Sequence, residues 1–315
     1  MRMTPSRAHA SSHGEEGSIT VHSQGGLGNQ LFIYGAGLAA AQAAGVRLRI
    51  DIGQHAARDD RPSVLERLGF PGEYVDLGFH SSAAEPIKVK IRRKASGKVR
   101  LIRGVGPPHG CTWRERVLRY DAAALCQPSG SCLSGYFQSW RYLEPVADEM
   151  RHMLERVFSA RRDRLESSAA TIAKSAGIVL HVRRGDYLAP EALDFHGLAG
   201  LPFYSEAVAT LRRMGLGGPL FVLSDDVEGA MQELAPLGEL KSLDFKSDDA
   251  LDELLLMSHA PALVIANSSF SWWAAWFGDR PERPVIAPRP WFDDRTLDDR
   301  DILPPHWLSL GRRTV

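Results

Sequence analysis

The stretch Ile178-Val179-Leu180-His181-Val182-Arg183-Arg184-Gly185-Asp186-Tyr187 passes abruptly from apolar to charged residues. The apolar part predicts a short buried β-strand over 178–182. Because side chains alternate along a strand, His181 and Arg183 are expected on one face and Arg184 on the other. One arginine can clamp phosphate oxygens with its planar fork of donors. An ion pair with Asp186 explains the same pattern, so the stretch alone leaves both readings open.

The chain around this stretch alternates regularly between strand and helix patterns. Repeated βα units of this length predict a parallel sheet with helices on both faces. The expected strands are 178–182, 220–223, 241–243, 262–266 and 285–287, and the expected helices are 202–214, 227–234, 248–258 and 267–277.

A second βαβ pattern occupies the N-terminal part of the chain. A strand over 19–23 leads into the glycine turn 25–30, followed by an alanine-rich helix to residue 44 and a strand over 46–50. With 315 residues, the chain is long enough for two domains. We therefore expect an α/β fold with two Rossmann-like domains. The expected segments are a disordered tail 1–18, a domain 19–165, a domain 166–290 and a C-terminal extension 291–315.

The glycine turn resembles part of a dinucleotide-binding fingerprint, since Gly26-x-Gly28 precedes a helix. Leu31 stands where the third glycine would be, so the fingerprint is incomplete. Free N–H groups at this helix start, with Asn29 and Gln30 beside them, suit a phosphate or a sugar hydroxyl. A tight turn with packed amides and a nicotinamide site are the alternatives.

Three expected strands of the second domain end in polar residues, at 181–186, 224–226 and 267–271. Ligands of open α/β sheets lie beyond the carboxyl ends of the strands. An arginine and a helix N-terminus can hold phosphates, and a carboxylate can accept from ribose or guanine. The donor-binding candidates here are His181, Arg183, Asp225, Asp226, Asn267, Ser268, Ser269 and Phe270. The acids and the serines have helix capping as their alternative role.

Charge and composition exclude several classes of function. Zero net charge and a pI near 7.2 give no reason to expect nucleic acid. Three irregularly spaced cysteines make neither a disulfide scaffold nor a four-ligand zinc site. No metal site is expected at Asp225 and Asp226, because adjacent acids on a strand point apart, nor in the charged run 299–301, which follows no strand.

No apolar stretch reaches the roughly 18 residues of a membrane-spanning helix. We expect a cytoplasmic protein that can contact a membrane surface. The basic run 88–103 is expected to be a solvated surface, with anionic lipid or a phosphorylated acceptor as the alternative.

Four motifs together resemble the bacterial α-1,2-fucosyltransferase family. They are His181-Val182-Arg183-Arg184-Gly185-Asp186-Tyr187, Gly26-Leu27-Gly28-Asn29-Gln30, Leu223-Ser224-Asp225-Asp226 and Ser268-Ser269-Phe270-Ser271-Trp272-Trp273. The resemblance implies a GT-B-like fold, GDP-fucose as donor, a β-galactoside as acceptor, inversion at the anomeric carbon, and no required metal or cofactor. The tail and the basic run are not covered by it.

The resemblance also implies roles for single residues. Arg183 would stabilise the charge that develops on the leaving diphosphate. His181 and Asp226 would bind the guanosine, and Gly26, Gly28 and Gln30 would lie at the donor. The general base is left open between Asp186 and Glu191, with Asn29 able to orient a hydroxyl but not to take its proton.

The aromatic segment 135–140 supports a different class, a non-catalytic glycan-binding module, because aromatic faces with an adjacent amide suit a sugar. An aromatic core is the alternative for these residues. An amphipathic helix over 141–158 and a connecting segment over 159–175 are expected to follow.

Overall fold

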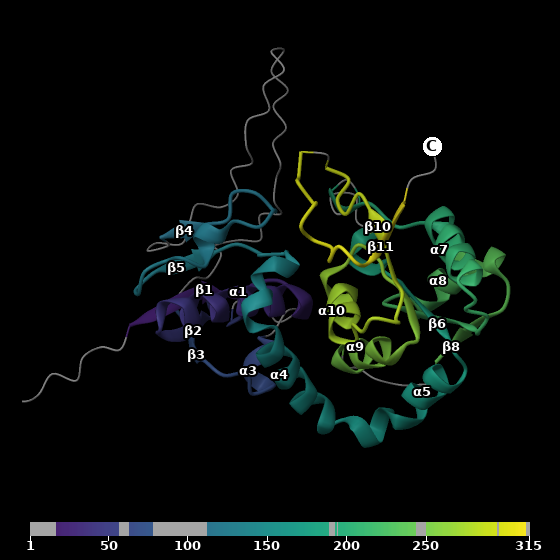
Figure 1. The fold of residues 1–315 in the computed structure, drawn as a ribbon, viewed down its shortest axis with the longest axis horizontal. Helices are drawn as coiled ribbons and strands as arrows, with labels where there is room; N and C mark the ends of the chain where they lie inside the picture. Colours follow the sequence, from purple (N-terminus) through teal and green to yellow (C-terminus); the bar gives the residue numbers. More distant parts are fainter. Residues whose placement is uncertain are drawn as a thin grey trace, which may run out of the picture.

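The protein folds into two α/β units that lie side by side, each built on a parallel sheet (Figure 1). The computed structural model describes residues 17–56, 63–77, 112–188, 193, 195–243, 250–294 and 296–312. The tail over 1–16 and the basic run 88–103 lie outside this range. The expected α/β class with two Rossmann-like, GT-B-like halves is confirmed.

The first sheet has five parallel strands in the order β3-β2-β1-β5-β4. Its strands are β1 (Ser18–His22), β2 (Arg47–Asp51), β3 (Glu73–Val75), β4 (Trp113–Arg114) and β5 (Cys132–Ser134). Its helices are α1 (Leu27–Ala44), α2 (Gly53–Ala56) and α3 (Val64–Arg67). The expected tail therefore ends before residue 18, where β1 begins.

The second sheet has six parallel strands in the order β11-β10-β9-β6-β7-β8. Its strands are β6 (Ile178–Val182), β7 (Leu220–Ser224), β8 (Leu240–Ser242), β9 (Ala262–Val264), β10 (Val285–Arg289) and β11 (Leu308–Gly311). Its helices are α7 (Leu201–Arg213), α8 (Val227–Leu234), α9 (Ala250–His259) and α10 (Ser269–Phe277). Since β11 pairs with β10, the expected C-terminal extension contributes a strand to this sheet.

Strand β6 is buried along its whole length and packs differently on its two faces. Ile178, Leu180 and Val182 belong to the apolar cluster that includes side chains of α7 and α8. Val179 belongs to the larger cluster on the opposite face, with side chains of α9 and α10. The alternation predicted from the sequence is therefore confirmed, and it fixes which face each following residue meets.

Helix α1 is apolar on all sides, as expected for a helix covered all round. It starts at Leu27, four residues before the predicted start, so Gly28 lies in its first turn. Gly37 allows close packing on the first sheet, because a Cβ there would meet Val21 Cγ1 at 2.5 Å. Gly45 ends the helix in the left-handed conformation.

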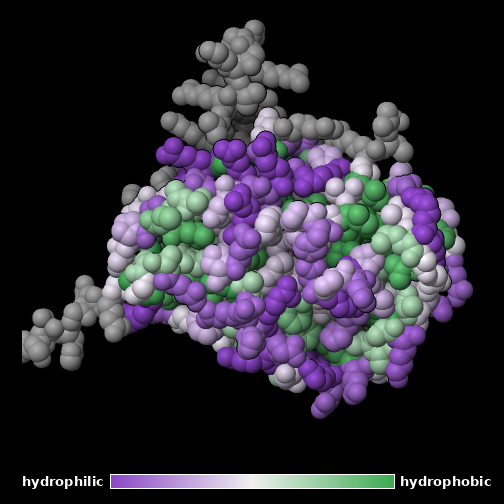
Figure 2. Space-filling model, in the orientation of Figure 1, coloured by the Kyte–Doolittle hydropathy of each residue, from purple (hydrophilic) through white to green (hydrophobic). Residues whose placement is uncertain are grey.

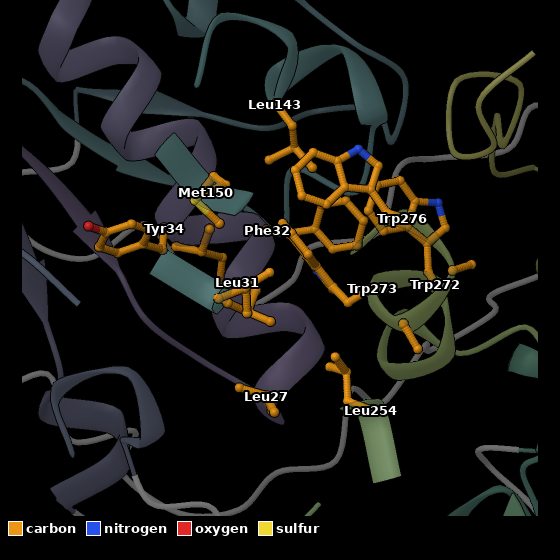
Figure 3. Close-up of a cluster of buried hydrophobic side chains, with 14 of the residues drawn as sticks. Leu27, Leu31, Phe32, Tyr34, Leu143, Met150, Leu254, Trp272, Trp273 and Trp276 are labelled. Carbon is orange, nitrogen blue, oxygen red and sulfur yellow. The ribbon is translucent and has the colours of Figure 1, made fainter. Parts of the chain in front are cut away.

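One apolar core continues from the first half of the protein into the second. Figure 3 shows Phe32 of α1 against the tryptophans of α10. The Phe32 ring centroid lies 4.5 Å from that of Trp272 and 5.2 Å from that of Trp273. Trp273 Nε1 also donates to the Gly28 carbonyl at 2.9 Å. The two halves therefore meet through apolar packing and not across open solvent.

The connection between the halves differs from the predicted single helix over 141–158. Two 3-10 turns (Trp140–Tyr142 and Glu144–Val146) precede α4 (Ala147–Ser159). Pro145 lies in the second turn and lacks the N–H that a longer helix would need there. Helix α5 (Arg162–Lys174) follows, so the expected boundary at 165/166 falls within a helix.

Helix α5 is fastened to α9 by a buried carboxylate. Asp252 is fully buried, and it pairs with Arg161 at 2.8 Å and with Arg164.

On the face seen in Figure 2, hydrophobic side chains form separate patches divided by hydrophilic ones. Among the helices that the structure describes, none is long and apolar enough to cross a bilayer.

Candidate active site

The three polar strand ends predicted from the sequence lie at one edge of the second sheet. Strands β9, β6 and β7 are consecutive neighbours, and all run parallel. The chain proceeds from β6 towards β7 and β8 on one side and returns to β9 on the other. The carboxyl ends of β6 and β9 therefore flank the switch point where ligands of such sheets bind.

Arg183 follows β6 on the face that His181 shares. Its guanidinium pairs with the Asp225 carboxylate at 3.0 Å and lies 5.5 Å from the centroid of the Tyr187 ring. The Arg183 side chain is 28% exposed. A partly exposed guanidinium held by a carboxylate is in place to receive an anion.

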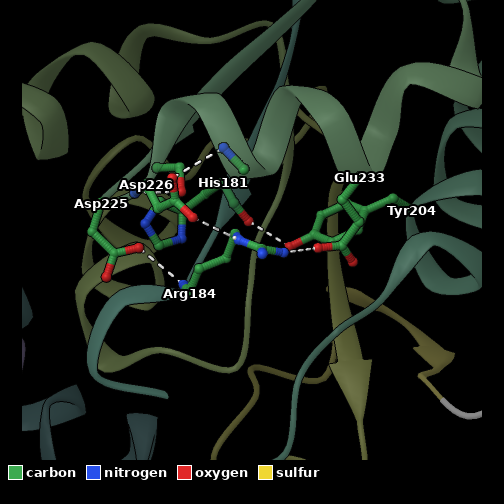
Figure 4. A network of polar contacts seen from close by, with 8 residues as sticks. His181, Arg184, Tyr204, Asp225, Asp226 and Glu233 are labelled. Atoms are coloured by element: carbon green, nitrogen blue, oxygen red, sulfur yellow. Dashed lines mark hydrogen bonds and ion pairs between the residues drawn. The ribbon is translucent and has the colours of Figure 1, made fainter. Parts of the chain in front are cut away.

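Arg184 points to the other side, towards α8 (Figure 4). Its Nε donates to Asp226 Oδ2 at 3.0 Å, and its terminal nitrogen pairs with Glu233. Its backbone N–H donates to Asp225 Oδ1 at 2.9 Å. The two guanidinium groups therefore have different partners, and Arg184 fastens β6 to α8.

Asp226 is the N-cap of α8, which was the alternative role left open for it. Its Oδ1 accepts from Gly229 N at 3.0 Å, and its own N–H donates to Ser224 Oγ at 3.0 Å. The Gly229 N–H and the Arg184 guanidinium hold the pKa of this carboxyl below its usual value. Asp226 is therefore an anion at neutral pH, with part of its acceptor capacity used within the protein.

His181 is buried on the face of β6 that looks towards α10. Its ring centroid lies 5.8 Å from that of Phe270, and its Nδ1 is buried without a partner among the described residues. Burial, with a smaller effect of the Arg183 charge, lowers the pKa of His181 to about 3. The ring is neutral, so it can offer a ligand one donor and one acceptor but no charge.

The residues after β9 form the start of α10. Asn267 is buried, and its Nδ2 donates to the carbonyls of His196 at 2.9 Å and Trp291 at 3.2 Å. Ser268 is the N-cap, with its Oγ accepting from Phe270 N at 3.3 Å. Ser269 is half-buried in the first turn. Asn267 and Ser268 therefore shape the helix start, whose N–H groups suit phosphate oxygens.

The glycine turn of the first domain lies against this helix start. A Cβ on Gly28 would lie 2.5 Å from the Ser269 carbonyl carbon and 2.7 Å from Phe270 N. Backbone atoms of α10 thus occupy the space beside Gly28 that a pyrophosphate would need in a dinucleotide-binding turn. Gly26 has nothing within 4 Å of a Cβ, so the two glycines serve different purposes.

The two amides of the turn also differ. Gln30 is buried, donates to the Gly25 carbonyl at 3.1 Å and accepts from Val64 N at 2.9 Å. Its amide stabilises the turn from within. Asn29 is half-buried, and its Oδ1 accepts from Gln138 Nε2 at 2.8 Å, which ties the turn to the loop after β5.

Gly28→Ala is expected to destabilise the fold by about 1–3 kcal/mol, because overpacking at a site lined by backbone cannot be relieved by a rotamer change. Thermal unfolding measures the effect as a lower Tm. Gly26→Ser is the matched control, since that site is open and serine is favoured at a helix N-cap. Equal Tm values for the two variants would contradict the assigned packing role of Gly28.

Glu253 is a carboxylate at this edge that sequence reasoning missed. It lies in the first turn of α9, and the N-terminus of a crossover helix faces the carboxyl edge of its sheet. Burial, with a further contribution from the Asp225 charge and an opposing one from Arg183, raises its pKa to about 6. Acidic residues are common in the first turn of a helix because they interact favourably with its dipole. No signal in the sequence therefore marked Glu253, and not its neighbour Asp252, as a site residue.

The two carboxylates that were expected to compete as general base are not placed. Residue 191 lies outside the described range, as does the side chain of Asp186. The arginine ion pair with Asp186 that the sequence left open needs that side chain, so it is likewise outside the described range. Together, the described groups supply a cation, a helix N-terminus, a neutral imidazole and a carboxyl group that changes protonation near pH 6. This set can bind a diphosphate and move a proton.

Comparison with known proteins identifies the family. The model of glycosyl transferase family 11 matches residues 121–311. An alpha-1,2-colitosyltransferase from Escherichia coli is 27% identical over 295 residues, covering 91% of this chain and 97% of that protein. The O-antigen biosynthesis glycosyltransferase WbnK, also from Escherichia coli, is 30% identical over 173 residues, covering 52% of this chain and 56% of that protein.

Solved structures similar to this chain include fucosyltransferases. NodZ from Bradyrhizobium has a TM-score of 0.44 at 15% identity, covering 82% of this chain and 93% of its own. A mutant of FUT1 from Arabidopsis thaliana in complex with GDP has a TM-score of 0.49 at 14% identity, covering 90% of this chain and 73% of its own.

Proposed function

The chain belongs to glycosyl transferase family 11, and from this premise we propose that it is an inverting α-1,2-fucosyltransferase. It transfers L-fucose from GDP-β-L-fucose to the 2-hydroxyl of a terminal β-galactoside. The observation that carries the proposal is the meeting of Arg183, the pair Asp225 and Asp226, and the start of α10 at one sheet edge. The protein is a glycosyltransferase, and the sugar, the acceptor and the linkage are the proposed part.

The diphosphate of the donor is proposed to lie between Arg183 and the first turn of α10. Negative charge develops on the β-phosphate as the bond to the sugar breaks. The Arg183 fork, held by Asp225, and the Ser269 N–H at the start of α10 are proposed to face that charge. In the bound state, the phosphate competes with Asp225 for the guanidinium.

The guanosine is proposed to lie beside His181 and the acidic pair. The neutral His181 ring can donate one hydrogen bond and accept another, and the Asp226 carboxylate can accept from N–H and O–H groups of the base and ribose. Asp226 also caps α8, so its loss affects both binding and the local fold. Gly28 lies against the start of α10, so the glycine turn is next to this region.

The proton of the attacking hydroxyl must go to a base. Asp186 and Glu191 remain proposals for this role, and Glu253 joins them with support from its position and chemistry. The charges of Asp225 and Arg183 both act on its pKa, so its carboxyl lies near the proposed diphosphate site. A pKa of about 6 keeps it deprotonated at neutral pH yet basic enough to accept a proton.

Colitose is the second candidate sugar, because the relative that matches this chain over 97% of the relative's own length is named an alpha-1,2-colitosyltransferase. Colitose lacks the 3-hydroxyl of fucose. The same diphosphate site would serve both donors, so the difference lies in contacts to the sugar ring.

Incubation with GDP-L-fucose or GDP-L-colitose and a panel of β-galactosides, followed by linkage analysis, tests the proposal. The expected product is an α-1,2-linked fucosyl galactoside with release of GDP. Transfer from GDP-L-colitose alone would replace fucose by colitose as the sugar. Oligosaccharide binding without transfer from either donor would contradict the proposed enzyme and favour a glycan-binding module.

A further inference from the structure

A hollow outside the proposed donor site opens between the loop after β5 and the C-terminal segment. Its volume is about 260 Å³. Trp140 contributes one side from the first half of the protein, and Trp307 and Ser309 contribute the other from the second half. Pockets for drug-sized ligands run from about 300 to 1,000 Å³. This hollow is smaller and suits about one monosaccharide unit.

The charged groups around the hollow are compensated within the protein. Arg289 pairs with Asp299 at 3.1 Å, and Arg300 pairs with Asp298 at 2.8 Å. Asp301, which also lines the hollow, accepts from the Tyr120 N–H at 3.1 Å. The hollow therefore offers hydrogen-bonding groups without a strong excess of either charge, which disfavours a phosphate or a metal ion as its ligand.

The aromatic groups define the class of ligand further. Trp140 is half-buried and Trp307 is 6% exposed, and both residues line the hollow. The C–H face of a pyranose can lie on an indole ring while its hydroxyls reach guanidinium and carboxylate groups at the edge. A neutral sugar unit satisfies both kinds of group, whereas a purely apolar ligand would leave the arginines and Asp301 unused.

The hollow lies next to the candidate active site. Arg289 ends β10, the neighbour of β9, and neighbouring strands lie about 4.8 Å apart. Two residues later, the Trp291 carbonyl accepts from Asn267 at the start of α10. On the opposite wall, Gln138 precedes Trp140 by two residues and bonds Asn29 in the first turn of α1. Both walls are thus connected to the groups that surround the donor.

We propose that this hollow is an acceptor subsite that binds the neutral sugar unit next to the galactose that receives the transferred sugar. The inference rests on the proposed glycosyl transfer and extends it to the recognition of the acceptor. Its walls come from both halves of the protein, so an extended glycan would bridge them. A single galactoside would reach the reaction site without touching the hollow.

Steady-state kinetics with two acceptors tests the subsite, using methyl β-D-galactoside and β-D-galactosyl-(1→3)-N-acetyl-D-glucosamine. Trp140→Ala is expected to raise the KM of the disaccharide by about 10-fold, a change of about 1.4 kcal/mol. The KM values of the monosaccharide and of the donor are expected to stay unchanged. Trp140→Phe keeps a ring and is expected to restore much of the disaccharide KM.

A second variant protects the test against misfolding. Arg300 lies at the opposite wall with its side chain 69% exposed, so Arg300→Ala should fold normally. It is expected to give the same preferential loss for the disaccharide. The subsite would be contradicted if a variant changed the KM of both acceptors equally. It would also be contradicted if neither variant changed the KM of the disaccharide.

A direct binding measurement separates this inference from the proposed function. Titration of the protein with the disaccharide, followed by calorimetry, needs no transfer reaction and no tryptophan as reporter. If the protein transfers neither sugar but binds the disaccharide, and Trp140→Ala weakens that binding, the hollow is a sugar-binding site and the proposed transferase function is contradicted. If the protein transfers the sugar but Trp140→Ala and Arg300→Ala bind the disaccharide as tightly as the wild type, the proposed function is supported and the acceptor subsite is contradicted.

Discussion

Arg183→Lys is expected to lower the turnover of glycosyl transfer by about 10²- to 10³-fold, the usual effect of removing one preorganised donor. Lysine keeps the positive charge but lacks the planar fork that binds two phosphate oxygens together. The loss should appear in kcat more than in the donor KM, because the charge on the β-phosphate grows towards the transition state. Initial rates at saturating donor and acceptor measure it.

Arg213→Lys is the matched control for this substitution. Arg213 pairs with Glu206 at 2.8 Å on the exposed side of α7, and the same loss of a fork there should leave turnover unchanged. Thermal unfolding of both variants checks that the site effect is not a folding effect. A near-normal rate for Arg183→Lys would remove Arg183 from the reaction and leave it as an ion-pair partner of Asp225.

Glu253→Gln is expected to lower kcat by about 10²- to 10⁴-fold at pH 7.5, the usual contribution of a general base. The wild-type rate should fall as the pH drops through about 6, because the carboxyl must be deprotonated to accept the hydroxyl proton. Donor phosphates near Glu253 add negative charge, which raises its pKa. The acidic limb should therefore lie at higher pH in kcat than in kcat/KM.

Glu228→Gln is the control for this experiment, since Glu228 is an exposed carboxylate in the first turn of α8. It should change neither the rate nor the pH profile. In Glu253→Gln, the acidic limb should disappear together with the rate. If the limb persists there and is lost in Asp186→Asn or Glu191→Gln, the base is one of those two residues and Glu253 serves only the charge balance of the site.

The sequence was sufficient to predict that three polar strand ends meet at one edge of the second sheet, because the pattern there is local. A buried run followed by charges, repeated at three strand ends, needs only the rule that parallel strands place their carboxyl ends together. The alternation along β6 also separated Arg183 from Arg184 correctly. The partner of Arg183 is Asp225, and those of Arg184 are Asp226 and Glu233. All three lie in or just before α8, more than 40 residues away in the chain.

The glycine turn shows where such reasoning stops. Gly26 and Gly28 look alike in the sequence, yet only Gly28 meets the backbone of α10. That contact joins residues about 240 positions apart, and no local pattern encodes it. The same holds for Glu253, whose pKa depends on its burial and on the charges of Asp225 and Arg183 in other segments, and for the hollow between Trp140 and Trp307.

The contact of α1 with α10 also limits how this protein can be divided into domains that fold on their own. Trp272 and Trp273 are fully buried against Phe32, and Gly28 lies against the first turn of their helix. A donor-binding half cut from the chain at α5 would leave these indole rings in water. A chimaera that exchanges this half between related enzymes must therefore include α1. The segment that has to be exchanged together is larger than either sheet with its own helices.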